Sequence, residues 1–580
     1  CAYMDLIEFD EECEDLLKEL IRTKTPVFHN AKFDIKFIEY HLGIKFPELV
    51  HDTMLMHYNL DERQGTHGLK SLALKYTKYG DYESDLYEWI AEYLKRTGTL
   101  KRDFSWEFIP FETMYPYAAM DSLVTLILAE MFLPLIEANK NLKKVYYDIL
   151  LPGMRALCWI EENGVPFDQS RLSICHKALN NKIVEVRQEL ASYKEVSDFE
   201  KAQGAEFNPN STQQLRKLLF DYVGLQPTGI KTGTGAHSTN AEVLEALAEE
   251  SPIPALILDI RKFGKIKNTY IDKILPELDA DERLRTNFNL HMTTSGRLSS
   301  SGKLNLQQLP RDVPIVKGAI KARPGYKIVA MDLGTAEVYA AAVLSGDQAL
   351  MDVFRQGENF HSTIAKLVFN LPCEISDVAE FYPIERQQAK AVTFGIMYGA
   401  GASKISAQVT KDSGRYFSKS DAQEVIDMYF KRFKGLKTWL KDMEKTIRRQ
   451  GYVYSIFGRK RRLVNVNSDD NREASHEVRS GINFLVQSVA SDINLLATVD
   501  MVENIIAEKK DTKIIALVHD SIIAEVPESE VDWYQETLRA ELEKDRGCSI
   551  PGAPITLDFD IGDDYSFGKY EKYADLDIAA

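Results

Sequence analysis

The sequence predicts a multidomain protein of the α/β class with an α+β arrangement of its elements. Its 580 residues exceed what a single hydrophobic core holds, so roughly three to five units are expected. Long segments with a 3.6-residue apolar period indicate helices. Two short apolar segments, 327–331 and 513–518, indicate strands, and each is followed closely by an aspartate.

The composition is that of a folded soluble protein, with 44% hydrophobic and 27% charged residues. No segment approaches the roughly 18 apolar residues of a membrane span, so no membrane partner is expected. The net charge of -16 does not exclude nucleic acid, because binding depends on local basic patches. Segments 431–437 and 459–462 are such patches, although a basic run is more often a solvated face. The six cysteines lack C-x-x-C spacing, which indicates a reducing cytoplasm without zinc or disulfides.

The amino-terminal part carries two polar pairs at helical spacing. Asn30 and Asp34 follow a short apolar strand in VFHNAKFD, and Tyr117 and Asp121 have the same spacing in YAAMD. Residues four apart lie on one face of a helix, so each pair is expected to share a helix face. Such pairs are more often surface decoration than functional groups.

A long helical region follows and is interrupted by a flexible segment. Apolar residues recur with a helical period over 147–192, 240–250 and 253–275. Between them, 226–238 (QPTGIKTGTGAHS) is rich in Gly, Thr and Pro, which predicts an exposed loop. Long helices with such a loop predict a projecting, mobile element.

The two predicted strands carry aspartates that a sheet could bring together. Segment 327–332 (KIVAMD) ends in Asp332, and 513–521 (KIIALVHDS) precedes a second apolar run, which predicts a hairpin with Asp520 at its tip. The intervening segment 347–496 is mostly helical. Nucleotidyl transfer uses two divalent cations about 4 Å apart, and Mg²⁺ prefers carboxylate oxygens. Either aspartate alone is more often an ordinary strand-end residue.

Segment 386–399 (RQQAKAVTFGIMYG) predicts a nucleotide-binding helix. Arg386, Lys390, Phe394 and Tyr398 recur every fourth residue and share one stripe. The cations can hold a triphosphate, and the rings can face the sugar and base. The alternative is an amphipathic helix with its rings in a core. The glycine after each ring favours the first interpretation, because it lets a substrate approach closely.

These motifs occur in an order that resembles family A DNA polymerases. The resemblance covers the chain from Thr293 to the C-terminus. It rests on the family's primer-template segment at 293–310 (TTSGRLSSSGKLNLQQLP), first palm motif at Asp332 and Glu337, fingers-helix motif at 386–399, minor-groove segment at 483–487 (NFLVQ), and second palm motif at His519 and Asp520.

The resemblance implies template-directed DNA synthesis from dNTPs on primer-template DNA, with two Mg²⁺ ions held by Asp332 and Asp520. Lys390 would protonate the leaving pyrophosphate. Glu337 would exclude a ribose 2′-hydroxyl with help from Tyr398, and Phe394 implies discrimination against dideoxynucleotides. The implied dNTP-binding residues are Arg386, Lys390, Phe394, Tyr398, Glu337 and His361. The implied DNA-binding residues are Arg297, Asn305, Gln307, Arg479, Asn483, Gln487 and His519.

Two palm motifs depart from the family pattern. The first usually reads DYSQIELR, whereas residues 332–339 read DLGTAEVY and keep the Asp and the Glu. In the second, Ser521 replaces the usual Glu after the His-Asp pair. We expect activity to survive with an altered metal response or fidelity. This drift resembles a bacteriophage or organellar replicase, in the cytoplasm of a bacterial host if phage-encoded.

The amino-terminal motifs resemble the 3′-5′ proofreading exonuclease that precedes family A polymerase domains. With 51–61 (HDTMLMHYNLD), they imply that Asp34 and Asp121 hold two further Mg²⁺ ions and that Tyr117 orients the attacking water, with Asn30 in the same motif as Asp34. The family's first motif, D-x-E, is not evident. Asp10 and Glu12 have that spacing but sit in a helix start, so the first strand either lies before Cys1 or is lost.

The implied fold is a right-hand polymerase of palm, fingers and thumb preceded by a ribonuclease H-like exonuclease domain. The expected boundaries are 1–145 for the exonuclease-like domain, 146–285 for the thumb, 286–346 and 484–580 for the palm, and 347–483 for the fingers. A monomer is expected, and no thioredoxin-type factor is implied.

Two other functions fit part of the pattern. A single-subunit RNA polymerase shares the palm aspartates and the fingers Lys and Tyr, but Glu337 argues against it because the RNA enzymes leave that space open. A non-catalytic DNA-binding relative is the second alternative, given the drift around Asp332. An enzyme used chiefly as an exonuclease is disfavoured by the missing D-x-E.

Overall fold

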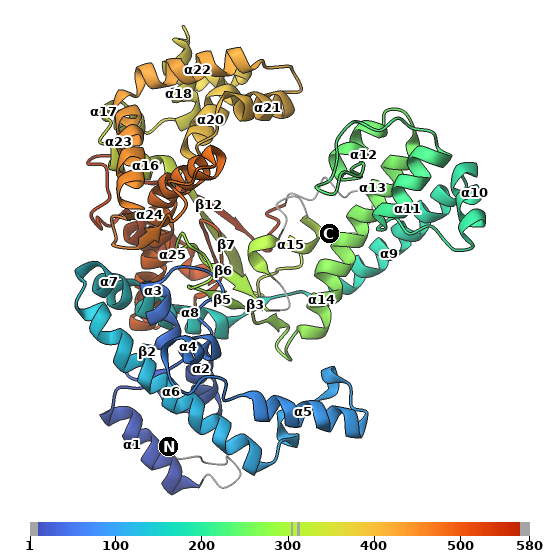
Figure 1. Ribbon diagram of the computed structural model, residues 1–580. Helices are drawn as coiled ribbons and strands as arrows, with labels where there is room; N and C mark the ends of the chain where they lie inside the picture. Colours follow the sequence, from blue (N-terminus) through green and yellow to red (C-terminus); the bar gives the residue numbers. More distant parts are fainter. Residues whose placement is uncertain (1–9, 303–304, 310–313, 569–580) are drawn as a thin grey trace.

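The computed structural model describes residues 10–302, 305–309 and 314–568. At its centre lies a four-stranded antiparallel sheet in the order β10-β11-β7-β12 (Figure 1). Its strands are β7 (Tyr326–Gly334), β10 (Lys513–Val518), β11 (Ser521–Pro527) and β12 (Thr556–Gly562). The predicted hairpin is therefore confirmed, and Asp332 lies inside β7 rather than after it.

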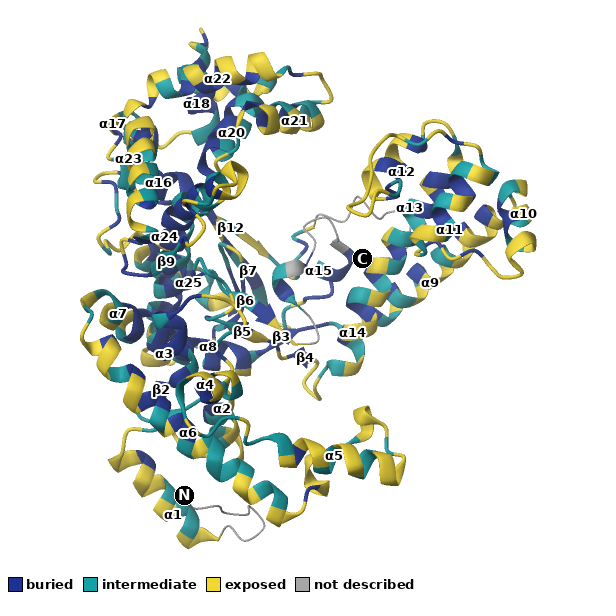
Figure 2. Ribbon diagram, in the orientation of Figure 1, coloured by how far each residue is buried: buried dark blue, intermediate teal, exposed yellow. Residues whose placement is uncertain are grey.

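Helices cover this sheet because β10 and β11 are apolar along almost their whole length. Helix α8 (Leu151–Asn163) packs against β10, while α24 (Asn471–Ala507) and α25 (Val531–Glu543) pack against β11. Helix α24 is the longest, and Figure 2 shows buried residues along it. The core of the polymerase-like part therefore runs along α24 and the sheet.

The segment between β7 and β10 is mostly helical, as predicted, and forms the lobe at the top left of Figure 1. Within it, α18 (Phe360–Phe369) packs on α20 (Pro383–Met397), and α20 packs on α21 (Ala402–Ser413). The other helices and strands of this segment, besides α24, are α16 (Ala336–Ser345), α17 (Gln348–Arg355), α19 (Val378–Phe381), α22 (Lys419–Arg432), α23 (Lys434–Gln450), β8 (Tyr452–Tyr454) and β9 (Lys460–Arg462).

A second helical lobe projects on the opposite side of the sheet (Figure 1). It comprises α9 (Gln169–Ala191), α10 (Lys194–Gln203), α11 (Thr212–Arg216), α12 (Ala241–Leu247), α13 (Pro252–Lys265) and α14 (Asp272–Ile274). Loop 226–238 lacks helix, as predicted, and carries one short bridge between Lys231 and His237. Helix α8, which falls within the expected unit 146–285, packs on β10, α24 and α2 (Ala31–Leu42). Gly164 and β3 (Val165–Pro166) separate it from α9.

The amino-terminal part consists of helices around a two-stranded parallel sheet. Asp10 accepts a hydrogen bond from the Cys13 backbone at 2.9 Å and caps the first helix, so the segment is a helix start, as expected. Besides α2, the elements are α1 (Glu11–Thr23), β1 (Val27–Phe28), β2 (His51–Asp52), α3 (Thr53–Leu60), α4 (Leu69–Tyr76), α5 (Ser84–Thr97), α6 (Phe111–Glu137) and α7 (Lys140–Val145).

Short elements link these parts. They are β4 (Arg283–Leu284), which pairs with β3, the hairpin of β5 (Asn287–Asn289) and β6 (Ser299–Ser301), and α15 (Pro314–Lys317).

The expectation that no segment is long and apolar enough to span a membrane is wrong for two of the described helices. By length and composition alone, α6 and α24 qualify, with mean hydropathies of 1.8 and 1.3 in their most apolar windows. The window in α24 is 72% buried within the protein, and that in α6 is 33% buried. Helix α24 is apolar because it runs through the core, and α6 packs against α3 and α4.

Candidate active site

A cleft of about 1360 Å³ opens where the carboxylate-bearing end of the central sheet faces α20. Its position explains how residues far apart in sequence meet, since the sheet and α20 supply opposite walls. Nine residues singled out in the sequence line it, namely Asp332, Glu337, His361, Lys390, Phe394, Tyr398, His519, Asp520 and Ser521.

Asp332 is the central residue of a row across three strands. In the sheet register it lies opposite Ser521 of β11 on one side and Asp558 of β12 on the other. The Ser521 hydroxyl donates a hydrogen bond to Asp332 Oδ1 at 2.6 Å. The Leu333 N–H donates to the Asp520 carbonyl at 3.3 Å, which brings the hairpin tip beside β7. These carboxylates offer the oxygen donors that Mg²⁺ prefers.

Asp558 and Asp560 are cleft residues that sequence reasoning missed. Both lie in β12, where the alternation TLDFDIG repeats an acid on every second residue. The side chains of alternate strand residues point to the same face, so this spacing was a usable signal. The sequence does not show that β12 lies beside β7, and this strand order is what brings the two acids close to Asp332.

The hairpin tip is held by Gln307. His519 has a left-handed backbone, with φ of 55°, and its N–H donates to Gln307 Oε1 at 3.1 Å. Gln307 Nε2 donates in turn to the Leu517 carbonyl at 2.9 Å. Asn305 Oδ1 accepts from the Gln307 N–H at 3.0 Å and from the Ser300 hydroxyl at 2.6 Å. Two predicted DNA-binding residues therefore also brace the site from within the chain.

Helix α20 presents the predicted stripe, with one change at its end. Tyr398 lies just beyond the last helical residue, and its N–H donates to the Phe394 carbonyl at 3.0 Å. Lys390 is exposed to the cleft. Arg386 does not line the cleft, because its Nε donates to the Ser362 hydroxyl of α18 at 3.2 Å.

The glycines that follow the two rings pack closely against other side chains of the chain, a role that the sequence interpretation did not anticipate. A Cβ on Gly395 would lie 2.7 Å from Ile405, and one on Gly399 would lie 2.5 Å from the Arg479 side chain. Gly399 also has a φ of 64°. Both glycines are therefore needed for packing within the chain.

His361 is a neutral residue at physiological pH. Burial, followed by the nearby cations Lys390 and Arg386, lowers its pKa to about 4. Its ring lies 5.5 Å from that of Phe394, measured between centroids, and its Nδ1 is buried without a hydrogen-bond partner. It can thus offer a hydrogen bond, but no charge, to a ligand in the cleft.

Glu337 is buried at the start of α16 with 5% of its surface exposed. Thr335, with a φ of 56°, makes the turn between β7 and α16. Arg297 Nη2 donates to Glu337 Oε1 at 2.5 Å. The pKa of Tyr398 is raised to about 12 by burial and by the adjacent Glu337 carboxylate. These three side chains form a charged and aromatic corner of the cleft.

A second cleft of about 680 Å³ adjoins the first and shares Tyr398 with it. It contains the predicted DNA-binding residues Arg479, Asn483 and Gln487. It also contains Lys404, Arg461 and His476, of which only Arg461 lay in a segment flagged by the sequence.

The first amino-terminal pair does not share a helix face, contrary to expectation. Asn30 precedes α2 in a left-handed conformation with a φ of 66°, and Asp34 lies in the first turn. The Asp52 carboxylate accepts hydrogen bonds from the N–H groups of Asn30 at 3.1 Å and Ala31 at 2.9 Å. Burial, and then the charge of Asp52, raise the pKa of Asp34 to about 7.

The second pair lies on α6, as expected, but Asp121 is already engaged. The Lys70 ammonium forms an ion pair with it, and the Tyr82 hydroxyl donates to it at 2.5 Å. The same ammonium lies 4.1 Å from the centroid of the Tyr117 ring. Across the described ranges no three His, Cys, Asp or Glu side chains are gathered to hold a metal. A cation at Asp121 would have to displace Lys70.

Comparison with known families gives two matches along the chain. Residues 176–566 match the family described as DNA polymerase family A, and residues 1–137 match that described as 3′-5′ exonuclease.

Similar curated proteins are polymerases that are longer than this chain. A DNA polymerase of Escherichia phage T5 is 49% identical over 94% of the chain and 67% of its own length. A DNA polymerase I of Chloroflexus aurantiacus is 32% identical over 88% of the chain and 52% of its own. A thermostable DNA polymerase I of Thermus aquaticus is 33% identical over 75% and 50%. The chain thus spans about half the length of the two bacterial relatives.

Among solved structures, the chain is similar to the POL domain of Pol1 from M. smegmatis in complex with DNA primer-template and dNTP. The TM-score is 0.78 at 24% sequence identity, over 98% of this chain and 91% of that one. At this identity the likeness concerns the fold, and it agrees with the right-hand architecture expected from the motifs.

Proposed function

The chain belongs to DNA polymerase family A, and we propose that it is a template-directed DNA polymerase that adds dNTPs to a primer 3′ end. The observation that carries the proposal is the single cleft in which Asp332 and Asp520 face Lys390, Phe394 and Tyr398. One wall suits divalent cations and the other suits a nucleotide, so the reacting groups of a nucleotidyl transfer can meet there.

Asp332 and Asp520 would hold the two Mg²⁺ ions of the reaction. When bound, such ions promote attack by the primer 3′-hydroxyl and neutralise the triphosphate. Ser521 would act on this site indirectly, because its hydroxyl donates a hydrogen bond to Asp332. That bond orients the carboxylate and leaves its second oxygen for a metal.

The far wall would bind the dNTP. Lys390 would pair with the triphosphate and protonate the leaving pyrophosphate. His361 would add a neutral hydrogen bond, since its pKa is about 4. Arg386, one helical turn before Lys390, would also pair with the triphosphate once its hydrogen bond to Ser362 is released. Phe394 would pack against the sugar or base.

Glu337 would exclude ribonucleotides. Its carboxylate is held by Arg297 at 2.5 Å and is buried, so it cannot move aside for a 2′-hydroxyl without leaving Arg297 unpaired. Tyr398 would close the same corner through its contact with Glu337. This arrangement favours a DNA polymerase over the RNA polymerase alternative.

Primer-template DNA would lie across the hairpin tip and the second cleft. Arg297, Asn305, Gln307, Arg479, Asn483, Gln487 and His519 remain the proposed contacts. Their polar side chains suit groove and backbone recognition, which does not depend on sequence.

A second proposed activity is 3′-5′ proofreading, favoured by the exonuclease family match over residues 1–137. Asp34 and Asp121 would hold its metal ions, while Tyr117 would orient the water. Because Lys70 occupies the carboxylate of Asp121, metal binding there would include release of this ion pair. Release of nucleotides from a labelled 3′ end, with Asp121→Asn as the inactive variant, tests this activity.

Primer extension with Mg²⁺ tests the main proposal. Asp332→Asn should abolish extension while leaving the fold intact, and Asp469→Asn, on an exposed loop, is the matched control. Retained extension by Asp332→Asn would show that the metal assignment is wrong. A wild-type preference for rNTPs over dNTPs would instead favour the RNA polymerase alternative, and failure to extend any primer would favour the non-catalytic one.

A further inference from the structure

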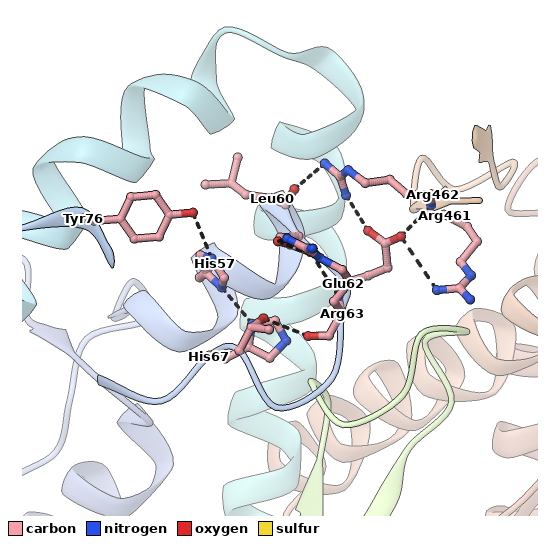
Figure 3. A network of polar contacts seen from close by, with 10 residues as sticks. His57, Leu60, Glu62, Arg63, His67, Tyr76, Arg461 and Arg462 are labelled. Atoms are coloured by element: carbon pink, nitrogen blue, oxygen red, sulfur yellow. Dashed lines mark hydrogen bonds and ion pairs between the residues drawn. The ribbon is translucent and has the colours of Figure 1, made fainter. Parts of the chain in front are cut away.

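The loop 61–67 joins the exonuclease part to β9 through Glu62 (Figure 3). Its carboxylate is buried, with 5% of the residue exposed. It accepts a hydrogen bond from the Arg462 backbone N–H at 2.5 Å and pairs with the Arg462 guanidinium, which also donates to the Leu60 carbonyl at 2.5 Å. The Arg461 Nη1 lies 3.9 Å from the same carboxylate. One acid thus holds Arg462 by hydrogen bonds and attracts Arg461 by charge, about 400 positions away in the sequence.

The charges in this contact do not balance. Glu62 supplies one negative charge, whereas Arg461 and Arg462 supply two positive ones. Arg462 takes the closer ion pair and the backbone contacts, so much of the charge of Arg461 remains available. The Arg461 side chain is 16% exposed and lines the second cleft. Glu62 therefore sets where this cation lies without neutralising it.

The second cleft has the character of a polyanion site. Besides Arg461, it is lined by Lys404 and Arg479, and no acidic residue is among the described residues that line it. Its remaining polar side chains are those of serine, threonine, asparagine, glutamine, histidine and tyrosine, which can donate hydrogen bonds to phosphate oxygens and sugars. A nucleic-acid backbone fits this combination.

The position of the cleft identifies the strand. Along α20 the cations precede the rings, so a nucleotide bound to the stripe has its phosphates at Lys390 and its base toward Tyr398. Tyr398 lines both clefts. The strand that pairs with the incoming base therefore continues past Tyr398 into the second cleft.

We propose that Arg461 binds a phosphate of the unpaired template strand and that Glu62, from the exonuclease part, is the residue that positions it. This inference rests on the proposed polymerase function. It adds a contact between the two parts of the chain that acts on template binding.

The exonuclease part also supports a second wall of this cleft. The Tyr58 hydroxyl donates to the Thr293 carbonyl at 2.9 Å, directly before Thr294 and Ser295, which line the cleft. Arg459, paired with the buried Asp492, packs against Gly296, where a Cβ would lie 2.8 Å from its side chain. Tyr58 and Glu62, both from the exonuclease part, thus contact two walls of the second cleft, one beside Thr294 and one at Arg461.

Binding of fluorescent DNA without divalent cations tests the proposal. Two DNAs of the same duplex sequence are compared, one blunt and one with a single-stranded 5′ template overhang. Arg461→Gln should weaken binding of the overhang DNA about threefold to tenfold and reduce its salt slope by about 0.7, the value for one phosphate contact on a single strand. Binding of the blunt duplex should change little.

Arg472→Gln is the matched control, because its side chain is 95% exposed at the start of α24 and does not line the second cleft. If Arg461→Gln weakened binding of both DNAs equally, or if Arg472→Gln weakened overhang binding as much, the effect would come from the overall charge of the protein. Either result would overturn the proposal. Unchanged overhang binding by Arg461→Gln would overturn it as well.

Glu62→Gln tests the positioning role, because it keeps the shape and an acceptor oxygen but removes the charge. We expect weaker overhang binding, and no further loss when it is combined with Arg461→Gln. Additive losses would overturn the positioning role, and Arg461→Gln still decides the phosphate contact if Glu62→Gln does not fold. Wild-type protein that binds neither DNA would contradict the proposed function itself.

Discussion

Asp332 shares its row of the sheet with another carboxylate. Asp558 lies directly opposite it on β12, and the side chains of such partners lie on the same face. Like charges in this position repel each other, whereas a divalent cation between them would remove the repulsion. Ser521, on the other side, contributes a hydrogen bond where a carboxylate would add a third charge. Asp332 thus has a carboxylate, Asp558, on one side in the sheet and a hydroxyl, Ser521, on the other.

Asp558→Asn should raise the free energy of unfolding in metal-free buffer by a few tenths of a kcal/mol to about 1 kcal/mol, because it removes this repulsion. It should also reduce the stabilisation that Mg²⁺ or Mn²⁺ confers on the protein. Thermal unfolding with and without the cation measures both effects. An unchanged response to metal in Asp558→Asn would show that this carboxylate takes no part in cation binding.

At the scale of elements, the end of α20 determines how the two clefts meet. Gly399 has a left-handed backbone and packs against Arg479 of α24, so the chain can turn away beside Tyr398. Gly357 offers a matched comparison, because it has a φ of 66° and a Cβ added to it would meet no atom within 4 Å. The two glycines share a backbone conformation and differ in their surroundings.

Gly399→Ala should therefore destabilise the protein more than Gly357→Ala. Both variants lose about 1 kcal/mol to the left-handed conformation, and Gly399→Ala also forces Arg479 to move, at a further cost of roughly 1–3 kcal/mol. Urea unfolding compares the two free energies directly. Equal losses would mean that Arg479 adapts freely and that the close packing at Gly399 is not a constraint.

At the scale of the whole molecule, the buried His57 and His67 and the half-buried His291 lie between the exonuclease part and the β5–β6 region. His57 Nδ1 and His67 Nδ1 are 2.8 Å apart, and the His67 ring lies 6.1 Å from that of His291. Burial lowers the pKa of all three, to about 4 for His57 and His291. One proton shared between two Nδ1 atoms also opposes charging of both rings.

Stability should consequently fall as the pH drops from about 6.5 toward 4. In that window the unfolded chain binds protons that the folded protein excludes, so the free energy of unfolding decreases with acid. For His57 the loss is on the order of 1–2 kcal/mol at pH 5. Denaturant unfolding at pH 5 and pH 8 measures it, and His57→Gln should narrow the difference between the two. If His57→Gln showed the same difference in free energy of unfolding between pH 5 and pH 8 as the unmodified protein, His57 would not be the source of the acid sensitivity.

Local patterns in the sequence determined the strands, the hairpin with Asp520 at its tip and the stripe on α20, because side-chain period and turn residues act over a few neighbours. Only the tertiary structure decided which acids share a row with Asp332, since strand order and register depend on pairing between distant segments. It also engaged Asp121 with Lys70, filled the space beside Gly399 with Arg479 and joined Glu62 to Arg461. These are contacts between oppositely charged or closely packed groups from separate elements, and no local period encodes them.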